Sequence, residues 1–386
     1  MAIPPGSLLG VLGGGQLGRM LGLAGRPMGF RFAFADPDPA CSARFLAEHV
    51  EEAPFSDPDA VVRLARRCAA LTIEIEKVSV EGMRSAAAIC PVRPGPEVLA
   101  IVQDRIRQKR WLETRGFPLG RWRAAESPAD AVEAFRELGD TVFLKAAQGG
   151  YDGRGQAMAH SEGEVSEAFN SLGNVPCAIE KSMDLAEELS VLVARRPSGQ
   201  TAVFPPALNH HEDRILTWSV LPAPLPPEIV AEARRIAEAI ARDLEVEGLL
   251  CVELFLDRAG RLFVNELAPR PHNSFHSTEM ATATSQFEQA IRAVCDLPLG
   301  DTSVLRPAAI INLLGDLWTS REGPAFPAAL EVPGVRLFLY GKGDPRPGRK
   351  MGHLGATGAT PAEAIERVIE GLARIRSAET DSRSPR

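Results

Sequence analysis

The sequence lacks most features that mark secreted, membrane-spanning or nucleic-acid-binding proteins. Its six cysteines are scattered and include no Cys-x-x-Cys pair, so we expect neither a zinc site nor a disulfide framework. It has no signal peptide and no apolar run of membrane-spanning length. The net charge of −7 argues against a nucleic-acid partner. We therefore expect a cytoplasmic protein that binds neither nucleic acid nor membrane.

What is present is typical of a globular α/β chain. Hydrophobic residues make up 45% and charged residues 24% of the 386 positions, enough for two or three domains. The alternation of strand and helix patterns favours a first domain over residues 1–96. We expect a central domain at 97–304, a smaller one at 305–376, and a disordered polar tail at 377–386.

Two apolar runs, residues 249–256 and 261–267, flank a polar turn and predict a β-hairpin. Each strand carries one acid, Glu253 and Glu266, and Asn265 stands beside the second. Paired strands would bring these carboxylates together, where a Mg²⁺ ion would relieve their repulsion. The alternative is a pair of half-exposed glutamates answered by arginines. Arg270, His272 and Asn273 follow the hairpin, where no packing pattern calls for them.

A first glycine-rich segment follows the strand predicted at residues 7–12. Gly13, Gly15 and Gly18 satisfy G-x-G-x-x-G, and Asp36 ends the next strand, at residues 30–35. Such glycines let the backbone approach an anion at a helix N-terminus. The segment could hold a nicotinamide cofactor or a phosphorylated substrate, or could simply be a tight turn. Further on, a strand at 71–76 would put Glu74 and Glu76 on one face.

A second glycine-rich segment follows a strand that ends at Lys145. Residues 149–155 contain four glycines, a tyrosine, an acid and a base, which favours a loop that binds phosphate oxygens. It is not a Walker A loop, because no Gly-Lys-Ser/Thr follows. The preceding helix, predicted at 97–115, carries Asp104, Arg105 and Lys109, which we assign to a solvated face.

A third such segment, residues 341–353, is called the basic segment below. Five basic residues alternate there with glycine and proline in an otherwise acidic chain, which favours an anion site. It follows a strand predicted at 335–340, and a final helix is expected at 361–376. Elsewhere, Glu188 is either an edge residue or a ribose-binding acid, and the loop predicted around Asn209 and His211 is polar surface.

Seven motifs together resemble a known family. In chain order they are GGGQLGRM, TIEIEKV, GGYDGRGQ, VELF, VNELAPRPHNS, TSQFEQ and GRKMGH, and the set is similar to 5-(carboxyamino)imidazole ribonucleotide synthase of the ATP-grasp superfamily. The resemblance spans roughly residues 8–354. It implies an ATP-grasp fold (α/β, α+β) with an N-terminal Rossmann-like (pre-ATP-grasp) domain and a small C-terminal domain, assembled as a homodimer. It also implies carboxylation of the amine of 5-aminoimidazole ribonucleotide in purine biosynthesis, with ATP, Mg²⁺ and bicarbonate as co-substrate, through carboxyphosphate.

The resemblance also assigns roles to individual residues. It implies that Glu253 and Glu266 bind the metal, and that the first glycine-rich segment holds substrate rather than a dinucleotide. The implied ATP-binding residues are Arg105, Lys145, Gly149, Gly150, Tyr151, Asp152, Gly153, Arg154, Gly155, Glu180, Lys181, Ser182, Met183, Glu188, His211, Asn265 and Glu266. The implied substrate-binding residues are Gln16, Leu17, Glu74, Lys342, Arg349 and Lys350, and the implied carboxylation site contains Tyr151, Asp152, Arg154, Arg270, His272 and Asn273.

The chain departs from the family pattern in two places. Phe275, His276 and Ser277 stand where the family commonly has Gly-His-Tyr, and Lys77 stands where it often has Asn. Three other functions remain as alternatives: a formate-dependent glycinamide ribonucleotide transformylase, an NAD-dependent oxidoreductase and an inactive nucleotide sensor. Whether Asp152 or His272 accepts the amine proton also stays open.

Overall fold

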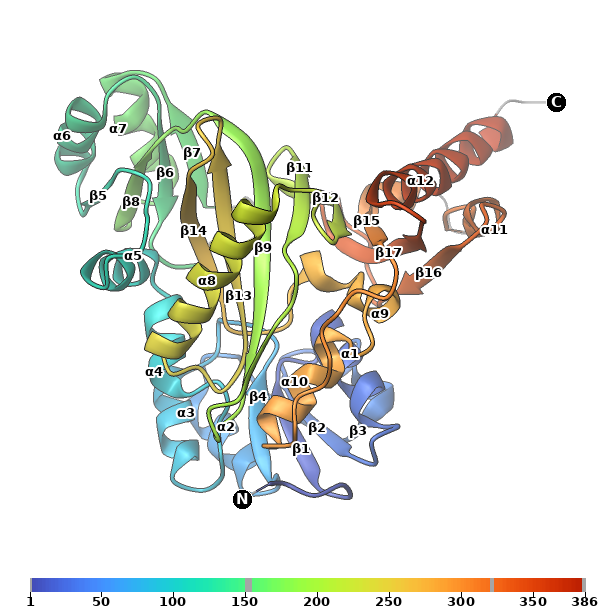
Figure 1. The fold of residues 1–386 in the computed structure, drawn as a ribbon. Helices are drawn as coiled ribbons and strands as arrows, with labels where there is room; N and C mark the ends of the chain where they lie inside the picture. The colour runs from blue at the N-terminus through green and yellow to red at the C-terminus, as the bar shows by residue number, and fades with distance from the viewer. Residues whose placement is uncertain (1, 150–154, 320–322, 384–386) are drawn as a thin grey trace.

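The computed structural model describes residues 2–149, 155–319 and 323–383. Within these ranges the chain forms three β-sheets with helices packed on them (Figure 1). The first is a parallel sheet of the order β3-β2-β1-β4, made of β1 (Leu8–Leu12), β2 (Arg31–Asp36), β3 (Ala47–Glu52) and β4 (Ala70–Ile73). Helices α1 (Gln16–Gly25), α2 (Pro58–Ala65) and α3 (Val80–Ala87) belong to the same region. This confirms the predicted Rossmann-like arrangement.

Strand β4 is shorter than predicted. It ends at Ile73, so Glu74 and Glu76 follow the strand and do not share one of its faces. The turn that carries them lies at the carboxyl end of the parallel sheet, where open α/β sheets bind ligands.

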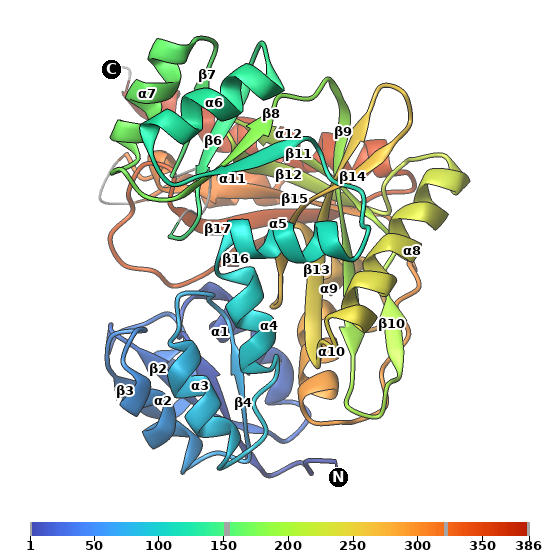
Figure 2. The ribbon, with the colours of Figure 1, turned by 90° about the vertical axis from the view of Figure 1, so that its left-hand side faces the viewer.

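The predicted helix at 97–115 is two helices, α4 (Pro96–Val102) and α5 (Arg105–Thr114). Asp104 breaks it, because its backbone is extended and its side chain accepts a hydrogen bond from the Arg107 amide at 2.9 Å. Aspartate is a preferred N-cap, so it starts a new helix instead of continuing the old one. Figure 2 shows α4 and α5 between the first region and the small sheet.

The small sheet is antiparallel and has the order β5-β8-β6-β7. Its strands are β5 (Trp122–Ala125), β6 (Val142–Ala146), β7 (Gln156–Ala159) and β8 (Cys177–Lys181). Helices α6 (Pro128–Leu138) and α7 (Glu162–Ser171) pack on it, with Val165 and Phe169 in the shared core (Figure 1). Gly149 and Gly155 bracket the connection between β6 and β7, and residues 150–154 lie outside the described residues.

The large sheet has the order β14-β13-β9-β11-β12-β15-β17-β16, with β10 paired to β9. Its strands are β9 (Leu185–Arg195), β10 (Thr201–Val203), β11 (Ala207–Glu212), β12 (Ile215–Leu221), β13 (Gly248–Asp257), β14 (Leu262–Ala268), β15 (Ala308–Leu314), β16 (Val335–Leu339) and β17 (Lys350–Thr357). Since β12 pairs with β15, the C-terminal strands continue the central sheet. The predicted boundary near residue 304 therefore divides one sheet between two sequence regions.

Two segments predicted as loops are strands of this sheet. Asn209 and His211 lie on β11, and Lys350 and His353 lie on β17. The loop predictions were wrong because both strands are rich in polar residues or glycine. Their hydrogen bonds to neighbouring strands outweigh that weak local preference.

The remaining helices cover the large sheet and its ends. They are α8 (Pro227–Asp243), α9 (Thr278–Ala281), α10 (Gln286–Val294), α11 (Phe326–Leu330) and α12 (Pro361–Arg383), with short 3₁₀ turns at Arg44–Leu46, Asn273–Phe275 and Gly315–Leu317. Helix α12 continues past its predicted end at 376, so residues 377–383 are helical and not an irregular tail. No proline or glycine interrupts that stretch, which leaves the helix free to continue.

All six cysteines are buried, and none forms a disulfide in this structure. Across residues 2–149, 155–319 and 323–383, no helix is both long and apolar enough to cross a membrane.

Candidate functional site

One cavity of about 1470 Å³ lies where the three sheets meet. The described residues predicted for the site all line it: Gln16, Leu17, Glu74, Arg105, Lys145, Gly149, Gly155, Glu180, Lys181, Ser182, Met183, Glu188, His211, Glu253, Asn265, Glu266, Arg270, His272, Asn273, Lys342, Arg349 and Lys350. Gly150, Tyr151, Asp152, Gly153 and Arg154 lie outside the described residues. Residues as far apart in the chain as Gln16 and Lys342, 326 positions, thus meet in one cavity.

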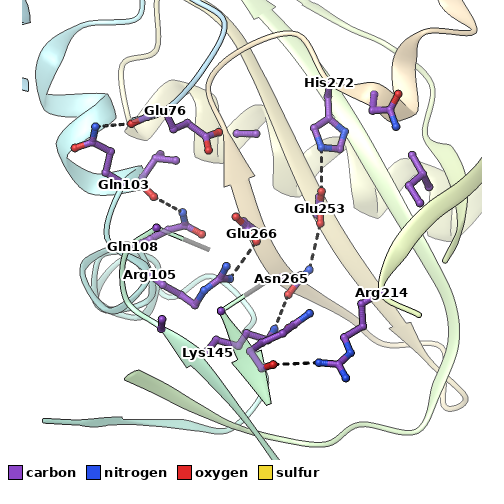
Figure 3. A pocket seen from close by; sticks show the side chains of 18 of the residues that line it. Glu76, Gln103, Arg105, Gln108, Lys145, Arg214, Glu253, Asn265, Glu266 and His272 are labelled. Carbon is purple, nitrogen blue, oxygen red and sulfur yellow. Dashed lines mark hydrogen bonds and ion pairs between the residues drawn. The ribbon is translucent and has the colours of Figure 1, made fainter. Parts of the chain in front are cut away.

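The predicted hairpin brings its two acids together. Glu253 on β13 lies directly opposite Glu266 on β14, with a bulge immediately after Glu253. Asn265 donates from Nδ2 to Glu253 Oε2 at 3.2 Å, as Figure 3 shows. Both carboxylates face cations, because His272 Nε2 lies 3.1 Å from Glu253 and Arg105 Nη1 lies 3.1 Å from Glu266. The pairing predicted from the strand pattern is confirmed.

The ion pair between Glu253 and His272 sets the charge of both groups. Burial would raise the pKa of Glu253, but the hydrogen bond and charge of His272 lower it to about 2. Burial would lower the pKa of His272, but the neighbouring Cys251 and Glu253 raise it to about 10. An opposite charge at this distance favours both charged forms, so the carboxylate and the imidazolium coexist at neutral pH.

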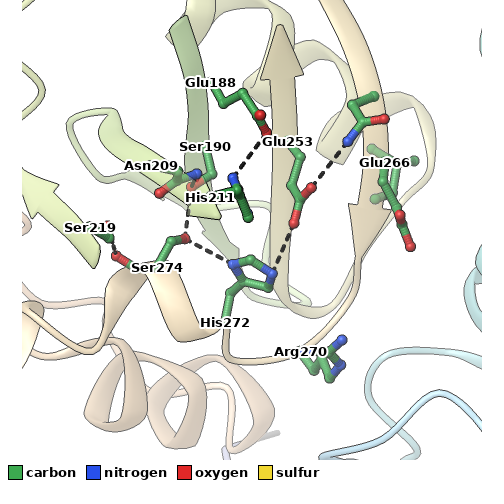
Figure 4. A network of polar contacts seen from close by, with 12 residues as sticks. Glu188, Ser190, Asn209, His211, Ser219, Glu253, Glu266, Arg270, His272 and Ser274 are labelled. Carbon is green, nitrogen blue, oxygen red and sulfur yellow. Dashed lines mark hydrogen bonds and ion pairs between the residues drawn. The ribbon is translucent and has the colours of Figure 1, made fainter. Parts of the chain in front are cut away.

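A chain of hydrogen bonds fixes the His272 ring from its other side (Figure 4). His272 Nδ1 lies 2.8 Å from Ser274 Oγ, which lies 2.7 Å from Ser190 Oγ. Asn209 donates to Ser190 at 3.0 Å, and Ser219 donates to the Ser274 carbonyl at 2.8 Å. Both ring nitrogens of His272 therefore have polar partners in the protein.

Five residues from α5, β6, β8 and β14 form a second charged group, the inner cluster: Arg105, Lys109, Lys145, Glu180 and Glu266. Glu180 contacts Lys145 at 2.9 Å and Lys109 at 3.2 Å. Burial would raise the pKa of Glu180, but Lys109, Lys145 and Arg105 lower it to about 2. Lys145 also donates to Asn265 Oδ1 at 3.4 Å (Figure 3), which links the cluster to the two hairpin acids.

Lys109 corrects the prediction of a solvated helix face. Only 2% of this residue is exposed, and burial lowers its pKa. It lies one helical turn after Arg105, so both cations point at the same cavity wall. The spacing of four residues from Arg105 is the one sequence signal that could have identified Lys109 as a cavity residue. It shows that the two cations share a helix face, but not whether that face meets a cavity or solvent.

Other lining residues were also missed by the sequence analysis. Arg214, in the turn between β11 and β12, donates to the Gln156 carbonyl at 3.1 Å beside Lys145 (Figure 3). Gln103 donates to the Val78 carbonyl at 2.7 Å, and Gln108 accepts from the Leu267 amide at 3.1 Å. These side chains bind backbone groups far away in sequence, which no local motif reveals.

On the opposite side of the cavity, Glu74 organises the first glycine-rich segment. Its carboxylate accepts hydrogen bonds from the amides of Gly15, Leu17 and Gly18 at 2.9–3.0 Å. Asp36 accepts from the Gly14 amide at 2.8 Å. The protein's own carboxylates thus occupy the amides that a dinucleotide phosphate would use in a Rossmann site.

The basic segment reaches this same loop. Lys342 donates to Gln16 Oε1 at 2.7 Å and to the Lys350 carbonyl at 2.8 Å. Arg349 donates to the carbonyls of Gly343 and Asp344, each at 2.8 Å. Two glycine-rich segments that were predicted separately therefore form one wall of the cavity.

Glu76 and Arg270 both line the cavity and form an ion pair of 3.1 Å. Burial lowers the pKa of Arg270, but the acids Glu76 and Glu74 raise it by more, so the pKa is raised overall. Among the described residues, no group of three or more His, Cys, Asp or Glu side chains could by itself hold a metal. Any metal at Glu253 and Glu266 would need further ligands from elsewhere.

Comparison with known families divides the chain into three parts. Residues 7–103 match the ribonucleotide synthetase preATP-grasp domain, residues 110–287 the ATP-grasp domain, and residues 308–367 the phosphoribosylaminoimidazole carboxylase C-terminal domain. These ranges correspond to the parallel sheet, to the small sheet with the first half of the large sheet, and to the C-terminal strands.

Whole-chain relatives agree with this division. N5-carboxyaminoimidazole ribonucleotide synthase of Bacillus subtilis (strain 168) is 36% identical over 353 residues, which cover 91% of this chain and 92% of the relative. The enzyme of the same name from Brucella melitensis is 38% identical over 355 residues, covering 92% and 97%.

Solved structures of proteins with this name are also similar. The ADP complex of an N5-carboxyaminoimidazole ribonucleotide synthetase superposes with a TM-score of 0.90 at 36% identity, covering 98% of this chain and 99% of that one. The Aspergillus clavatus enzyme, in complex with ADP and 5-aminoimidazole ribonucleotide, gives a TM-score of 0.86 at 28% identity, covering 96% and 99%. This chain therefore belongs to the N5-carboxyaminoimidazole ribonucleotide synthase family, with the ATP-grasp fold.

Proposed function

We propose that this protein uses ATP and bicarbonate to carboxylate the exocyclic amine of 5-aminoimidazole ribonucleotide, releasing ADP and phosphate. The observation that carries the proposal is the single cavity that holds the inner cluster, the two hairpin acids and the basic segment. A nucleotide triphosphate and a second phosphorylated substrate need separate cationic sites that open into one reaction space. The solved Aspergillus clavatus relative, which contains ADP and 5-aminoimidazole ribonucleotide together, supports that division.

ATP is assigned to the inner cluster and the segments beside it. Lys145 and Arg105 supply cations, Gly149 and Gly155 bracket the phosphate-loop segment, and Glu188 lies 3.1 Å from His211 further along the cavity. The backbone from Glu180 to Met183 connects the small sheet to the large one. We assign 5-aminoimidazole ribonucleotide to Gln16, Leu17, Lys342, Arg349 and Lys350, with Glu74 holding the glycine-rich loop in shape.

The residues present fit a magnesium site. Glu253 and Glu266 lie opposite each other and Asn265 donates to Glu253, which gives the hard oxygen ligands that Mg²⁺ prefers together with substrate phosphates. Bound there, Mg²⁺ would supply positive charge against the phosphate oxygens. Arg105, which balances Glu266 in the protein alone, would then be available to anions of the substrates.

The proposed chemistry has two steps. Bicarbonate oxygen attacks the γ-phosphorus of ATP, the bond to the β-phosphate oxygen breaks, and ADP leaves as carboxyphosphate forms. Lys145 holds positive charge at the transferring phosphoryl group, where charge develops. The amine of the ribonucleotide then attacks the carboxyl carbon of carboxyphosphate and displaces phosphate. Alternatively, carboxyphosphate first breaks down to phosphate and CO₂, and the amine attacks the carbon of CO₂. By either route the amine loses one proton.

His272 is better suited to charge balance than to accepting that proton. Its two ring nitrogens face Glu253 and Ser274, and its pKa is raised to about 10 by Glu253 and Cys251 against the effect of burial. A general base must have a free nitrogen and a pKa near the working pH. In the protein without metal, His272 therefore balances charge, and we keep both His272 and Asp152, which lies outside the described residues, as candidate acceptors in the loaded enzyme.

An ADP-release assay with matched acceptors tests the proposal. ATP and bicarbonate with 5-aminoimidazole ribonucleotide should give saturable ADP release and a product that carries label from ¹⁴C-bicarbonate. Glycinamide ribonucleotide with formate should give neither. If the formate pair supported turnover instead, the chain would be the transformylase alternative. No ATP turnover with any acceptor would favour the nucleotide sensor.

We also propose a homodimer in the cytoplasm, because the family resemblance implies one. Light scattering on the purified chain should give about twice the mass of 41.5 kDa. A mass equal to one chain across micromolar concentrations would contradict it.

A further inference from the structure

A buried group of polar side chains lies behind the basic segment and outside the cavity lining. Tyr340 is 1% exposed, and His353 and His276 are fully buried. The chemistry proposed above uses none of them. Burying polar groups is costly unless they bind one another, so their presence needs an explanation.

Tyr340 and His353 fasten the two ends of the basic segment together. Tyr340 Oη lies 2.8 Å from His353 Nδ1, and the Tyr340 amide donates to the Met351 carbonyl at 3.0 Å. Lys342, Arg349 and Lys350 all lie between these two anchors. The hydrogen bond therefore fixes the base of the loop that carries the proposed phosphate-binding cations.

Tyr340 also supports Lys342 directly. The Lys342 ammonium lies 5.5 Å from the centre of the Tyr340 ring, within the range of a cation–π contact. Gly341, between them, has a φ of +69°, and a side chain there would meet the Arg19 guanidinium at 2.7 Å. The chain can thus pass from the buried Tyr340 to the cavity-facing Lys342 within one residue.

The same group reaches the His272 turn on the other side. The His353 ring stacks on His276, with centres 5.0 Å apart and planes at 17°. Gln286 donates from Nε2 to His276 Nδ1 at 3.2 Å and to the His272 carbonyl at 2.9 Å, and its Oε1 accepts from the His272 amide at 2.8 Å. A continuous set of contacts therefore joins the basic segment to the backbone of His272.

The charge states agree with this arrangement. Burial lowers the pKa of His353 to about 3 and the pKa of His276 well below its usual value. Burial raises the pKa of Tyr340. A neutral phenol and a neutral imidazole can share this hydrogen bond, and the tautomer of His353 sets which of them donates.

We propose that Tyr340, His353, His276 and Gln286 form a positioning unit, which holds the basic segment and the His272 turn in register around the phosphate end of the ribonucleotide. None of the four makes the substrate contact itself; they act through Lys342, Arg349 and the His272 backbone. This inference rests on the proposed function, because it takes the basic segment as the substrate's phosphate site.

Two variants isolate the Tyr340–His353 hydrogen bond. Tyr340→Phe removes only the hydroxyl and keeps the ring beneath Lys342, so the KM for 5-aminoimidazole ribonucleotide should rise about tenfold. His353→Leu should give a similar rise. His353→Asn keeps an amide that can accept or donate a hydrogen bond near the place of Nδ1, and should stay within about threefold of the wild-type constant. The KM for ATP and kcat should change less than about twofold in all three.

Thr302→Val provides the matched control. It removes one hydroxyl hydrogen bond, from Thr302 Oγ1 to the Val203 carbonyl at 3.0 Å, away from the cavity lining. It should leave both KM values unchanged, and thermal melts of each variant check that the protein is folded. If His353→Leu does not fold, Tyr340→Phe and His353→Asn carry the test.

The outcomes separate this inference from the proposed function. An unchanged ribonucleotide KM in Tyr340→Phe would overturn the positioning unit, and so would a rise in both KM values together. Equal constants for His353→Asn and His353→Leu would show that the hydrogen bond is not what positions the loop. If the wild-type protein itself gave no ADP release that saturates with the ribonucleotide, the proposed function would fail before any variant was compared.

Discussion

The inner cluster and the basic segment are both cationic walls of one cavity, but their charges are balanced differently. In the inner cluster, Lys109 and Lys145 share Glu180, whose side chain is 12% exposed, at 2.9–3.2 Å. In the basic segment, Arg349 binds two carbonyl oxygens at 2.8 Å and has its nearest carboxylate, the exposed Asp344, at 3.9 Å. The cations of the first wall are paired with carboxylates of the protein, whereas Arg349 in the second is bound mainly to neutral carbonyl oxygens.

That difference predicts where a substitution harms folding and where it harms binding alone. Removing one member of a buried ion pair leaves a charge with no partner, which is strongly destabilising. Removing the part-exposed Arg349 leaves neutral carbonyls and the exposed Asp344, which keeps Arg346 as a partner at 3.2 Å. The predictions below test this contrast, from the largest expected effect to the smallest.

Glu266→Gln should give the largest loss of activity. It removes a carboxylate assigned to the metal and also the partner of Arg105 at 3.1 Å. Loss of several kcal/mol of transition-state stabilisation corresponds to a fall in kcat of at least about a hundredfold. ADP release at saturating Mg²⁺ measures it.

The control for that variant is Glu187→Gln, the same change on the exposed face of β9. It should have normal activity. Near-wild-type turnover of Glu266→Gln would show that the hairpin acids do not hold a metal needed for catalysis.

Glu180→Gln should cost stability as well as activity. The change leaves the buried Lys109 and the largely buried Lys145 without their shared carboxylate, which should lower the free energy of unfolding by about 3–5 kcal/mol. Urea titrations at neutral pH measure it. A loss below about 1 kcal/mol, the range for surface pairs, would contradict the view that this wall is balanced internally.

The pH dependence of stability gives an independent check on Glu180. Its folded-state pKa is lowered to about 2, because Lys109, Lys145 and Arg105 outweigh the effect of burial. A lowered pKa stabilises the folded state above the unfolded value of about 4.5, and this contribution is lost as pH falls toward 2. Between these limits, the wild type should lose more stability than Glu180→Gln does.

Arg349→Ala should affect binding and not folding. Losing a charge-assisted hydrogen bond to phosphate should raise the KM for 5-aminoimidazole ribonucleotide about ten- to a hundredfold and leave the KM for ATP unchanged. Arg258→Ala, which removes an exposed arginine paired with Asp184 at 2.9 Å, is the matched control. A rise in the ATP constant alone would assign the basic segment to the nucleotide.

Features of the site could be predicted from the sequence where they depend on local patterns, and could not where they depend on distant partners. The hairpin acids were found because strand pairing and alternation are local patterns, and Glu253 does face Glu266. The three glycine-rich or basic segments were found because their compositions do not suit a core. The burial of Lys109 and the three amides bound by Glu74 were not found, since both depend on partners more than fifty positions away.

The predicted limits of helices and strands were wrong where one side chain or a partner strand outweighs the local preference. Asp104 divides a helix that periodicity alone would continue. Strand β17 contains two glycines, Gly352 and Gly355, and its pairing with β15 and β16 decides its conformation. Tertiary partners, which one sequence does not display, decide such cases.

The smallest expected effect is the absence of one: the purified protein should not bind NAD or NADP. The G-x-G-x-x-G segment and Asp36 match a dinucleotide fingerprint. However, Glu74 already accepts hydrogen bonds from the amides of Gly15, Leu17 and Gly18. Asp36 accepts one from the Gly14 amide, and not from a ribose hydroxyl. A pyrophosphate placed there would meet a carboxylate, and like charges at contact distance repel. Calorimetric titration should therefore show no saturable heat up to about 1 mM cofactor. Saturable binding at micromolar concentration would mean that this loop binds a nicotinamide cofactor. The loop and the basic segment would then not form one ribonucleotide site.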